Sequence, residues 1–238
     1  KATAETDIVS EISDPKSEIS EAYLAIRSSL AFTTDHGVPR SLMVVSSQPA
    51  EGKSTTALAL ATVLARVGRR VILIDADLRN PSIHGFLDID REHGVSNYLA
   101  GDDDLARLVK PVAERLDFVA AGPSVPSAAE LLSSDRMMKL ITRLQQDYDH
   151  VVVDSAPIIG LADAPLVSRT VEGVIFVVET GAVSVRGLQA ALSRLRGASA
   201  PLLGVIMTKF DIKDSDYGYG YSYQYNYGSR QATEPANV

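Results

Sequence analysis

Cysteine is absent from this chain of 238 residues, and so is any long apolar run. Without cysteine the chain can form neither a disulfide nor a cysteine-ligated zinc site, so a reducing compartment is the natural expectation. No apolar stretch approaches the roughly 20 residues that a membrane-spanning helix needs, and no signal peptide is visible. The sequence begins with Lys1 rather than methionine, so we expect a piece cut from a longer protein, with any membrane segment outside it.

Positive charge is also in short supply. Lysine and arginine number 23 against 30 aspartates and glutamates, which gives a formal net charge of -7 at pH 7. A nucleic-acid-binding domain normally shows a basic face, so we expect no nucleic-acid partner. A phosphate site is not excluded, because such a site needs local hydrogen-bond donors rather than a global charge. The apolar content of 45% is ordinary for a globular protein, and the length suffices for one large domain.

Short apolar runs alternate with helical patterns along most of the chain. Runs that are apolar on both faces indicate strands covered on both sides, and their alternation with helices predicts an α/β fold with a doubly wound, mostly parallel sheet. In such sheets ligands bind at the carboxyl ends of the strands. The predicted strands are 42–46, 71–75, 116–121, 150–154, 173–179 and 203–208. The predicted helices are 17–32, 54–67, 127–146, 162–169 and 185–196.

The two ends of the chain lack this alternation. Residues 1–17 are polar and mixed, and we interpret them as a loose linker. Residues 213–238 contain no Val, Ile or Leu before Val238, so they are predicted to be a disordered, flexible tail. The domain itself is therefore expected to occupy residues 18–212.

A phosphate-binding loop follows the first predicted strand. The segment SSQPAEGKST matches the pattern G-x-x-x-x-G-K-[ST] at Gly52, Lys53 and Ser54, but Ser47 stands where the first glycine belongs. We expect Lys53 to be an exposed loop group that reaches the β- and γ-phosphates, and the Ser54 hydroxyl to bind Mg²⁺. A chance match at a helix start is the alternative. The predicted ATP-binding residues are Ser47, Ala50, Glu51, Gly52, Lys53, Ser54 and Thr55.

Carboxylates end two other predicted strands. Asp75 and Asp77 follow a buried run, and their spacing points them the same way if the strand continues. Asp154 ends a Walker B pattern, where it can hold Mg²⁺ through water. Helix capping or an ordinary strand-ending acid explains one of these residues but not all three, because neighbouring buried carboxylates are costly without a cation. The predicted metal ligands are Ser54, Asp75, Asp77 and Asp154, and the predicted catalytic residues are Lys53, Asp75, Asp77 and Asp154.

These motifs resemble those of the bacterial tyrosine kinases of exopolysaccharide export systems. SSQPAEGKST, VILIDADLRNP and VVVDSAP are similar to that family's Walker A, Walker A′ and Walker B motifs, and the resemblance covers about residues 21–227. It implies a P-loop NTPase-like kinase domain that uses ATP and Mg²⁺ and leaves ADP. It is also the resemblance, rather than spacing, that separates the roles of the acids: Asp77 is the candidate base and Asp75 a metal ligand, with the reverse assignment still open.

Six of the nine tyrosines alternate along the predicted tail. An edge strand with one aromatic face is one interpretation, but glycine is poor in strands and no aliphatic residue accompanies the tyrosines. A flexible segment that presents several hydroxyls suits phosphate acceptors better. Tyr23, Tyr98 and Tyr148 lie in structured stretches and are expected to be packing residues. The predicted phosphoacceptors are Tyr217, Tyr219, Tyr221, Tyr223, Tyr225 and Tyr227.

The resemblance also implies partners and a place in the cell. Members use a Glu-x-x-Arg-x-x-Arg motif on the first helix to assemble into a ring-like homo-oligomer such as an octamer. Within that ring, tail tyrosines are phosphorylated in trans. Glu21 and Arg27 match that motif as oligomer contacts, whereas Leu24 replaces its middle arginine. The other implied partners are a membrane-anchoring activator and a protein-tyrosine phosphatase. The implied place is the cytoplasmic face of the inner membrane, and the implied role is control of polysaccharide synthesis or export.

Two other functions remain open at the level of sequence. Partition and septum-site ATPases are nucleotide switches with the same loop, but they carry a signature lysine where this chain has Gln48, and they lack a tyrosine tail. An adaptor that binds nucleotide and assembles without catalysis is the second alternative. Phosphotyrosine formed during ATP turnover would separate the kinase from both.

Overall fold

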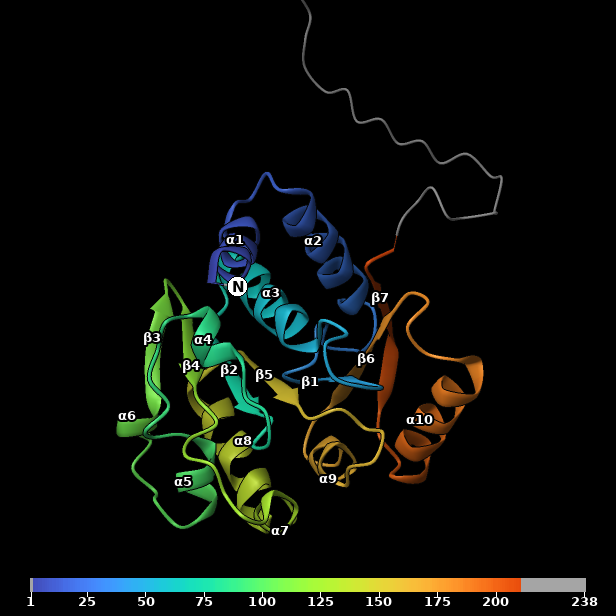
Figure 1. Cartoon of the computed structure of the whole chain (residues 1–238). Coiled ribbons are helices and arrows are strands. Elements are labelled where there is room, and N and C mark those ends of the chain that lie inside the picture. The colour runs from blue at the N-terminus through green and yellow to red at the C-terminus, as the bar shows by residue number, and fades with distance from the viewer. Residues whose placement is uncertain (1, 211–238) are drawn as a thin grey trace, which may run out of the picture.

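A computed structural model describes residues 2–210, with side chains from residue 8 onward (Figure 1). The six tail tyrosines therefore lie outside the described residues. A seven-stranded sheet in the order β3-β4-β2-β5-β1-β6-β7 forms the centre, and helices cover both of its faces. Every neighbouring pair is parallel except β3 and β4. The predicted doubly wound, mostly parallel α/β sheet is confirmed.

The central strands are buried along their whole length. Helices on both faces exclude water from β1, β2 and β5, which explains why these segments are apolar at consecutive positions. The edge strand β3 was missed in the sequence because it contains Pro111 and is only half buried, so it has no continuous apolar run. The strands are β1 (Ser41–Ser46), β2 (Val71–Ala76), β3 (Val109–Ala113), β4 (Leu116–Val119), β5 (His150–Ser155), β6 (Gly173–Glu179) and β7 (Leu202–Thr208).

Ten helices accompany the strands within residues 2–210, and none of them is long and apolar enough to cross a membrane. The single helix predicted over 127–146 is two helices, because Ser133 and Ser134 at the break donate their hydroxyls to carbonyls of the preceding turn. The helices are α1 (Ala2–Ser13), α2 (Glu18–Leu30), α3 (Lys53–Arg66), α4 (Ile83–Phe86), α5 (Val95–Leu99), α6 (Leu105–Leu108), α7 (Ala128–Leu132), α8 (Asp135–Asp147), α9 (Asp163–Ser168) and α10 (Val185–Gly197).

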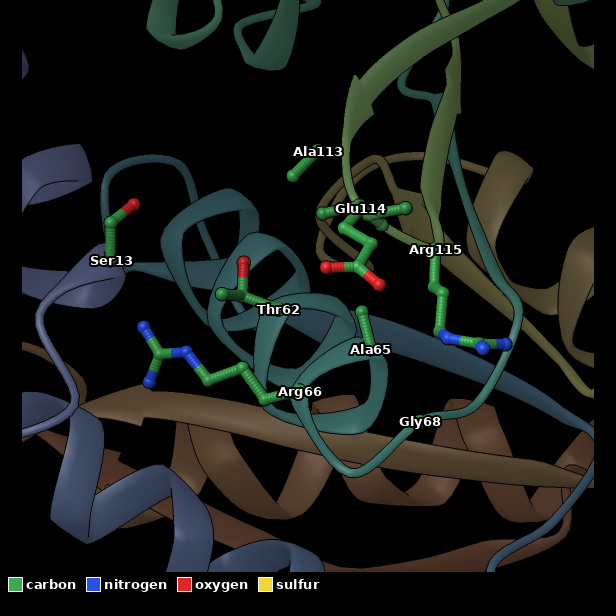
Figure 2. A pocket seen from close by; sticks show the side chains of 9 residues that line it. Ser13, Thr62, Ala65, Arg66, Gly68, Ala113, Glu114 and Arg115 are labelled. Atoms are coloured by element: carbon green, nitrogen blue, oxygen red, sulfur yellow. The ribbon is translucent and has the colours of Figure 1, made fainter.

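The linker predicted over residues 1–17 is wrong for most of its length, because α1 is a helix docked on the domain. Ile12 is only 2% exposed and belongs to the core beneath α3. Arg66 of α3 donates to the Ile12 carbonyl and to the Ser20 hydroxyl, which ties α1 and α2 to α3. Figure 2 shows Arg66 extending toward Ser13 beside a cavity of about 450 Å³. The sequence hid this contact because few apolar residues mark the docked face.

Replacing Ile12 by alanine should therefore destabilise the domain. We expect Ile12→Ala to lower the free energy of unfolding by about 2–4 kcal/mol, as for other large-to-small core substitutions. The measurement is urea unfolding, with Glu11→Ala as a matched control because Glu11 is exposed on the same helix. If residues 1–17 were a loose linker, the two variants would be equally stable.

Candidate active site

The loop between β1 and α3 leaves the start of α3 open. Gly52 is the N-cap residue of α3, with φ of +91°, and no side chain caps the helix. An added Cβ at Gly52 would be strained by this φ and would lie 3.4 Å from the Thr208 methyl group, so glycine suits the position. An uncapped helix N-terminus offers N–H groups and partial positive charge, which favour a phosphate.

Glu51 holds this loop from the inside. It is 1% exposed, and its carboxylate accepts hydrogen bonds from the Ser47 hydroxyl at 2.7 and 2.8 Å and from the Gln48 N–H at 2.8 Å. Thr208 of β7 donates its hydroxyl to the Glu51 carbonyl at 2.8 Å. The side chains of Ser47 and Glu51 therefore brace the loop, and the serine at the first-glycine position has this structural use.

A cavity of about 460 Å³ opens beside the loop. Its walls come from three segments that follow β1, β2 and β5. These strands are parallel neighbours, so their carboxyl ends lie at one edge of the sheet, as expected for a ligand site in such a fold. Ala50 and Gly52–Thr55 line the cavity on one side, Asp77 and Arg79 on another, and Pro157 closes it.

Lys53 forms ion pairs with two acids of this site, Asp77 and Asp154. Its ammonium nitrogen lies 3.0 Å from Asp77 Oδ2, 3.2 Å from Asp154 Oδ2 and 3.0 Å from the Ser54 hydroxyl. Burial by itself would lower the pKa of Lys53, but the charges of Asp154 and Asp77 outweigh it and raise the pKa above its ordinary value. The expectation of an exposed loop group was wrong: Lys53 is 7% exposed because the carboxylates draw its ammonium inward.

Asp154 lies at the end of β5 and is completely buried. Its Oδ2 accepts a hydrogen bond from the Ser54 hydroxyl at 2.6 Å. Burial raises the pKa of Asp154, whereas Lys53 and Ser54 favour its charged form. A hydroxyl and a carboxylate oxygen this close suit Mg²⁺, which takes one or two carboxylates from a protein and fills its other positions with water and phosphate oxygens.

Asp75 lies beside the site but does not line the cavity. It ends β2 beside Asp154 in the sheet register, and its carboxylate accepts hydrogen bonds from the backbone N–H groups of Asp77 at 3.1 Å, Ser82 at 3.2 Å and Ile83 at 3.3 Å. Burial, followed by the charge of Asp154, raises the pKa of Asp75 to about 8. Asp75 therefore fixes the turn after β2.

Asp77 presents its carboxylate to the cavity. Its Oδ1 accepts a hydrogen bond from the Asn80 N–H at 3.0 Å, and its Oδ2 faces Lys53. Ser54, Asp77 and Asp154 of the four predicted metal ligands are thus gathered around Lys53, which lies between the two acids, whereas Asp75 does not line the cavity. Among the described residues, no group of three or more acidic or histidine side chains is arranged to hold a metal ion by itself.

Arg79 is a site residue that the sequence interpretation missed. Its guanidinium donates to Asp163 in a bidentate pair, from Nε at 2.7 Å and from a terminal nitrogen at 3.0 Å. Asp163 is completely buried at the start of α9, so the pair ties the segment after β2 to α9. The signal was present in the sequence, because Arg79 lies two positions after Asp77 in the segment VILIDADLRNP.

The tyrosines within the domain pack as predicted. Tyr98 is 3% exposed, the Tyr23 hydroxyl lies 2.8 Å from the Thr56 hydroxyl, and Tyr148 donates to Asp117 at 2.6 Å.

The predicted oligomer contacts lie on α2. Glu21 and Leu24 are exposed there, whereas Arg27 is half-buried. Two of the three positions of the predicted oligomerisation motif are therefore exposed on the surface of α2.

The sequence of this chain is similar to those of known AAA domains and tyrosine-protein kinases. The family model for the AAA domain matches residues 42–201. Tyrosine-protein kinase YwqD of Bacillus subtilis (strain 168) is 36% identical over 209 residues, which are 87% of this chain and 88% of that kinase. Tyrosine-protein kinase etk of Escherichia coli (strain K12) is 32% identical over 82% of this chain, but the chain spans only 27% of its length.

A solved structure agrees with these relatives. The kinase domain of Escherichia coli tyrosine kinase ETK superposes with a TM-score of 0.77 at 31% identity, covering 87% of this chain and 82% of that structure. A plasmid partition protein from Borrelia burgdorferi, at 23% identity, a TM-score of 0.60 and coverage of 76% and 84%, shares the P-loop NTPase-like fold alone. The chain therefore belongs to the family of bacterial tyrosine-protein kinases.

Proposed function

We propose that the cavity at the β1–α3 loop binds ATP and that the site transfers the γ-phosphoryl group to tyrosines of the chain's own tail. The observation that carries this is the position of Lys53, whose buried ammonium lies next to both acids and the Ser54 hydroxyl at the open start of α3. A lysine on a flexible stem can exchange carboxylates for phosphate oxygens without movement of the backbone. The α3 N–H groups would hold the remaining phosphate charge.

The donor set near Ser54 fits Mg²⁺. Ser54 and Asp154 would hold the ion, and Asp77 would contribute through water, because Mg²⁺ keeps several waters in such sites. The Asp75 carboxylate is held by backbone N–H groups and does not line the cavity, so we leave it out of this set. When bound at Ser54 and Asp154, Mg²⁺ would supply positive charge next to the phosphate oxygens. On the chain's side, Lys53 screens the charge of the same oxygens, and Arg79 keeps the segment that carries Asp77 in place through Asp163.

We assign the base to Asp77, because it lines the cavity and Asp75 does not. A tyrosine hydroxyl has a pKa near 10, so a nearby carboxylate helps to remove its proton. The tyrosine oxygen forms a bond to the γ-phosphorus, the bond from that phosphorus to the β-γ bridging oxygen breaks, and the proton passes to Asp77. The products are phosphotyrosine and ADP.

The wider setting is proposed from the family. Transfer would occur in trans within a ring-like homo-oligomer, with Glu21 and Arg27 as contacts and Leu24 as a weak point. A membrane-anchoring activator and a tyrosine phosphatase would be partners at the cytoplasmic face of the inner membrane. The role would be control of polysaccharide synthesis or export.

The two acids should separate in mutant kinetics. We expect Asp77→Asn to lower the rate of phosphoryl transfer by about a hundredfold or more, as for loss of a general base, with little change in ADP affinity. Asp154→Asn should weaken the dependence on Mg²⁺ and the transfer rate together. Rapid-quench assays and ADP titrations measure the two effects, and Asp147→Asn is a control because Asp147 is exposed on α8. An equal loss of ADP affinity in both variants would argue against a separate base.

Substitution of the six tail tyrosines tests the acceptor. With phenylalanine at Tyr217, Tyr219, Tyr221, Tyr223, Tyr225 and Tyr227, we expect nearly all phosphotyrosine to be lost while ADP binding is kept. Mass spectrometry locates the label in the unmodified chain. Label found mainly on Tyr23, Tyr98 or Tyr148 would show that the tail is not the acceptor.

A further inference from the structure

A second cavity lies at the opposite end of the sheet from the P-loop. It has a volume of about 510 Å³ and is formed by the end of α2, the loop into β1, the end of α3, the segment before β2 and the start of β5. Because β1, β2 and β5 are parallel, these segments all meet at the amino ends of the strands. Nothing in the proposed transfer reaction uses this cavity.

The cavity is basic in a chain that is acidic as a whole. Arg27, Arg40 and Arg69 line it, together with two histidines and a single acid, Asp149. With both histidines neutral, three arginines against one aspartate leave two positive charges in the lining, whereas the chain carries -7. Asp149 is already engaged, since its carboxylate accepts the Arg70 N–H at 2.8 Å.

Two of the basic side chains that line the cavity, His150 and Arg27, have buried nitrogen atoms or a buried ring. His150 is 8% exposed, and its Nδ1 donates to the Pro39 carbonyl at 2.9 Å, which fixes the ring and leaves Nε2 for another partner. Burial, and then the charges of Arg69 and Arg40, lower the pKa of His150, so both guanidinium groups act on this ring. Arg27 Nε is buried and has no hydrogen-bond partner among the described residues.

Other groups at the rim limit the positive charge but do not cancel it. His36 pairs with Glu172 at 3.3 Å, and the same carboxylate accepts the Arg40 N–H at 2.7 Å. The Arg40 guanidinium donates to the Gln145 carbonyl. Arg69 has no such contact within the described part of the chain, so its five donors are available to a ligand.

We propose that this cavity binds a phosphate monoester, supplied by phosphotyrosine of the chain's own tail in the same or a neighbouring copy. This rests on the proposed autophosphorylation. Clustered arginines recognise phosphate through paired N–H donors, and such clusters are a recurring means of binding phosphorylated side chains. The apolar part of the lining comes from Ala31, Val38, Leu64 and Val67. These side chains can pack against the aromatic ring of a phosphotyrosine, whereas they would add nothing to the binding of a free phosphate ion.

The length of the tail allows this contact. The described chain stops at Phe210, just after β7, and the tail tyrosines lie 7 to 17 positions beyond it. At roughly 3.3–3.6 Å per extended residue, these positions reach about 25–60 Å from Phe210. The strand β7 itself accounts for about 23 Å of the distance between the two ends of the sheet, so the later tyrosines can reach the cavity.

A synthetic peptide separates this inference from the proposed kinase activity. The probe is the segment 219–227 with phosphate on Tyr223, added to the unphosphorylated full chain without ATP, with binding measured by fluorescence anisotropy. We expect Arg69→Gln to weaken binding about five- to tenfold, in line with the loss of one exposed charge-assisted contact. Arg70→Gln should change binding less than twofold, because Arg70 is the adjacent exposed arginine and does not line the cavity.

The remaining arms decide the ligand and the location. The unphosphorylated peptide should not bind, and inorganic phosphate should bind at least tenfold more weakly than the phosphopeptide. Saturating ADP should leave the phosphopeptide affinity unchanged. Equal affinities of the Arg69→Gln, Arg70→Gln and unmodified proteins would overturn the proposal, as would competition by ADP or equally tight binding of inorganic phosphate. Because the peptide is phosphorylated chemically, these outcomes do not depend on whether the chain phosphorylates itself.

Discussion

The buried contact of Lys53 with Asp77 and Asp154 is the constraint on which the rest of the site depends. Two ionised carboxylates are costly to bury side by side without a cation nearby, and removing one partner of a buried ion pair commonly costs about 3–5 kcal/mol. Here the cation comes from the first residue of α3, and the acids come from the ends of β2 and β5. The same three groups are those that phosphate and Mg²⁺ would engage, so the protein's own charges already offset one another in part at the position where the charges of ATP·Mg²⁺ would enter.

The parallel sheet makes this arrangement possible. The register of β2 and β5 sets Asp75 beside Asp154, and β1 lies directly next to β5, so the loop before α3 meets both acids at one edge. Interactions from more distant parts of the chain then hold these segments: Thr208 donates to the Glu51 carbonyl in the loop before α3, and Arg79 ties the segment after β2 to Asp163. At the amino ends of the same strands, the segments that precede them place several basic residues around one cavity. The fold thus separates the proposed site of phosphoryl transfer from the proposed site for its product.

The motif residues and the buried strands could be predicted from the sequence, because both are marked by local patterns. Gly52, Lys53, Ser54 and the acids follow apolar runs at fixed spacing, and the predicted sheet is correct apart from the half-buried β3. What the sequence did not carry depends on contacts between distant segments. The burial of Lys53 against Asp154 and the docking of α1 through Ile12 each require partners tens of residues away. The Asp75 carboxylate is instead held by backbone N–H groups two to eight residues further along the chain. Spacing could not separate Asp75 from Asp77, whereas in the structure only Asp77 of the two lines the cavity.

The most direct test of this account is formation of phosphotyrosine by the purified chain with ATP and Mg²⁺. Quantitative mass spectrometry should find phosphotyrosine in the unmodified protein and in Lys139→Met, since Lys139 is exposed on α8. Lys53→Met should form almost none, because it lacks the charge that balances the phosphates and the acids. Circular dichroism would establish that this variant is folded. An equal yield of phosphotyrosine in folded Lys53→Met would contradict the account.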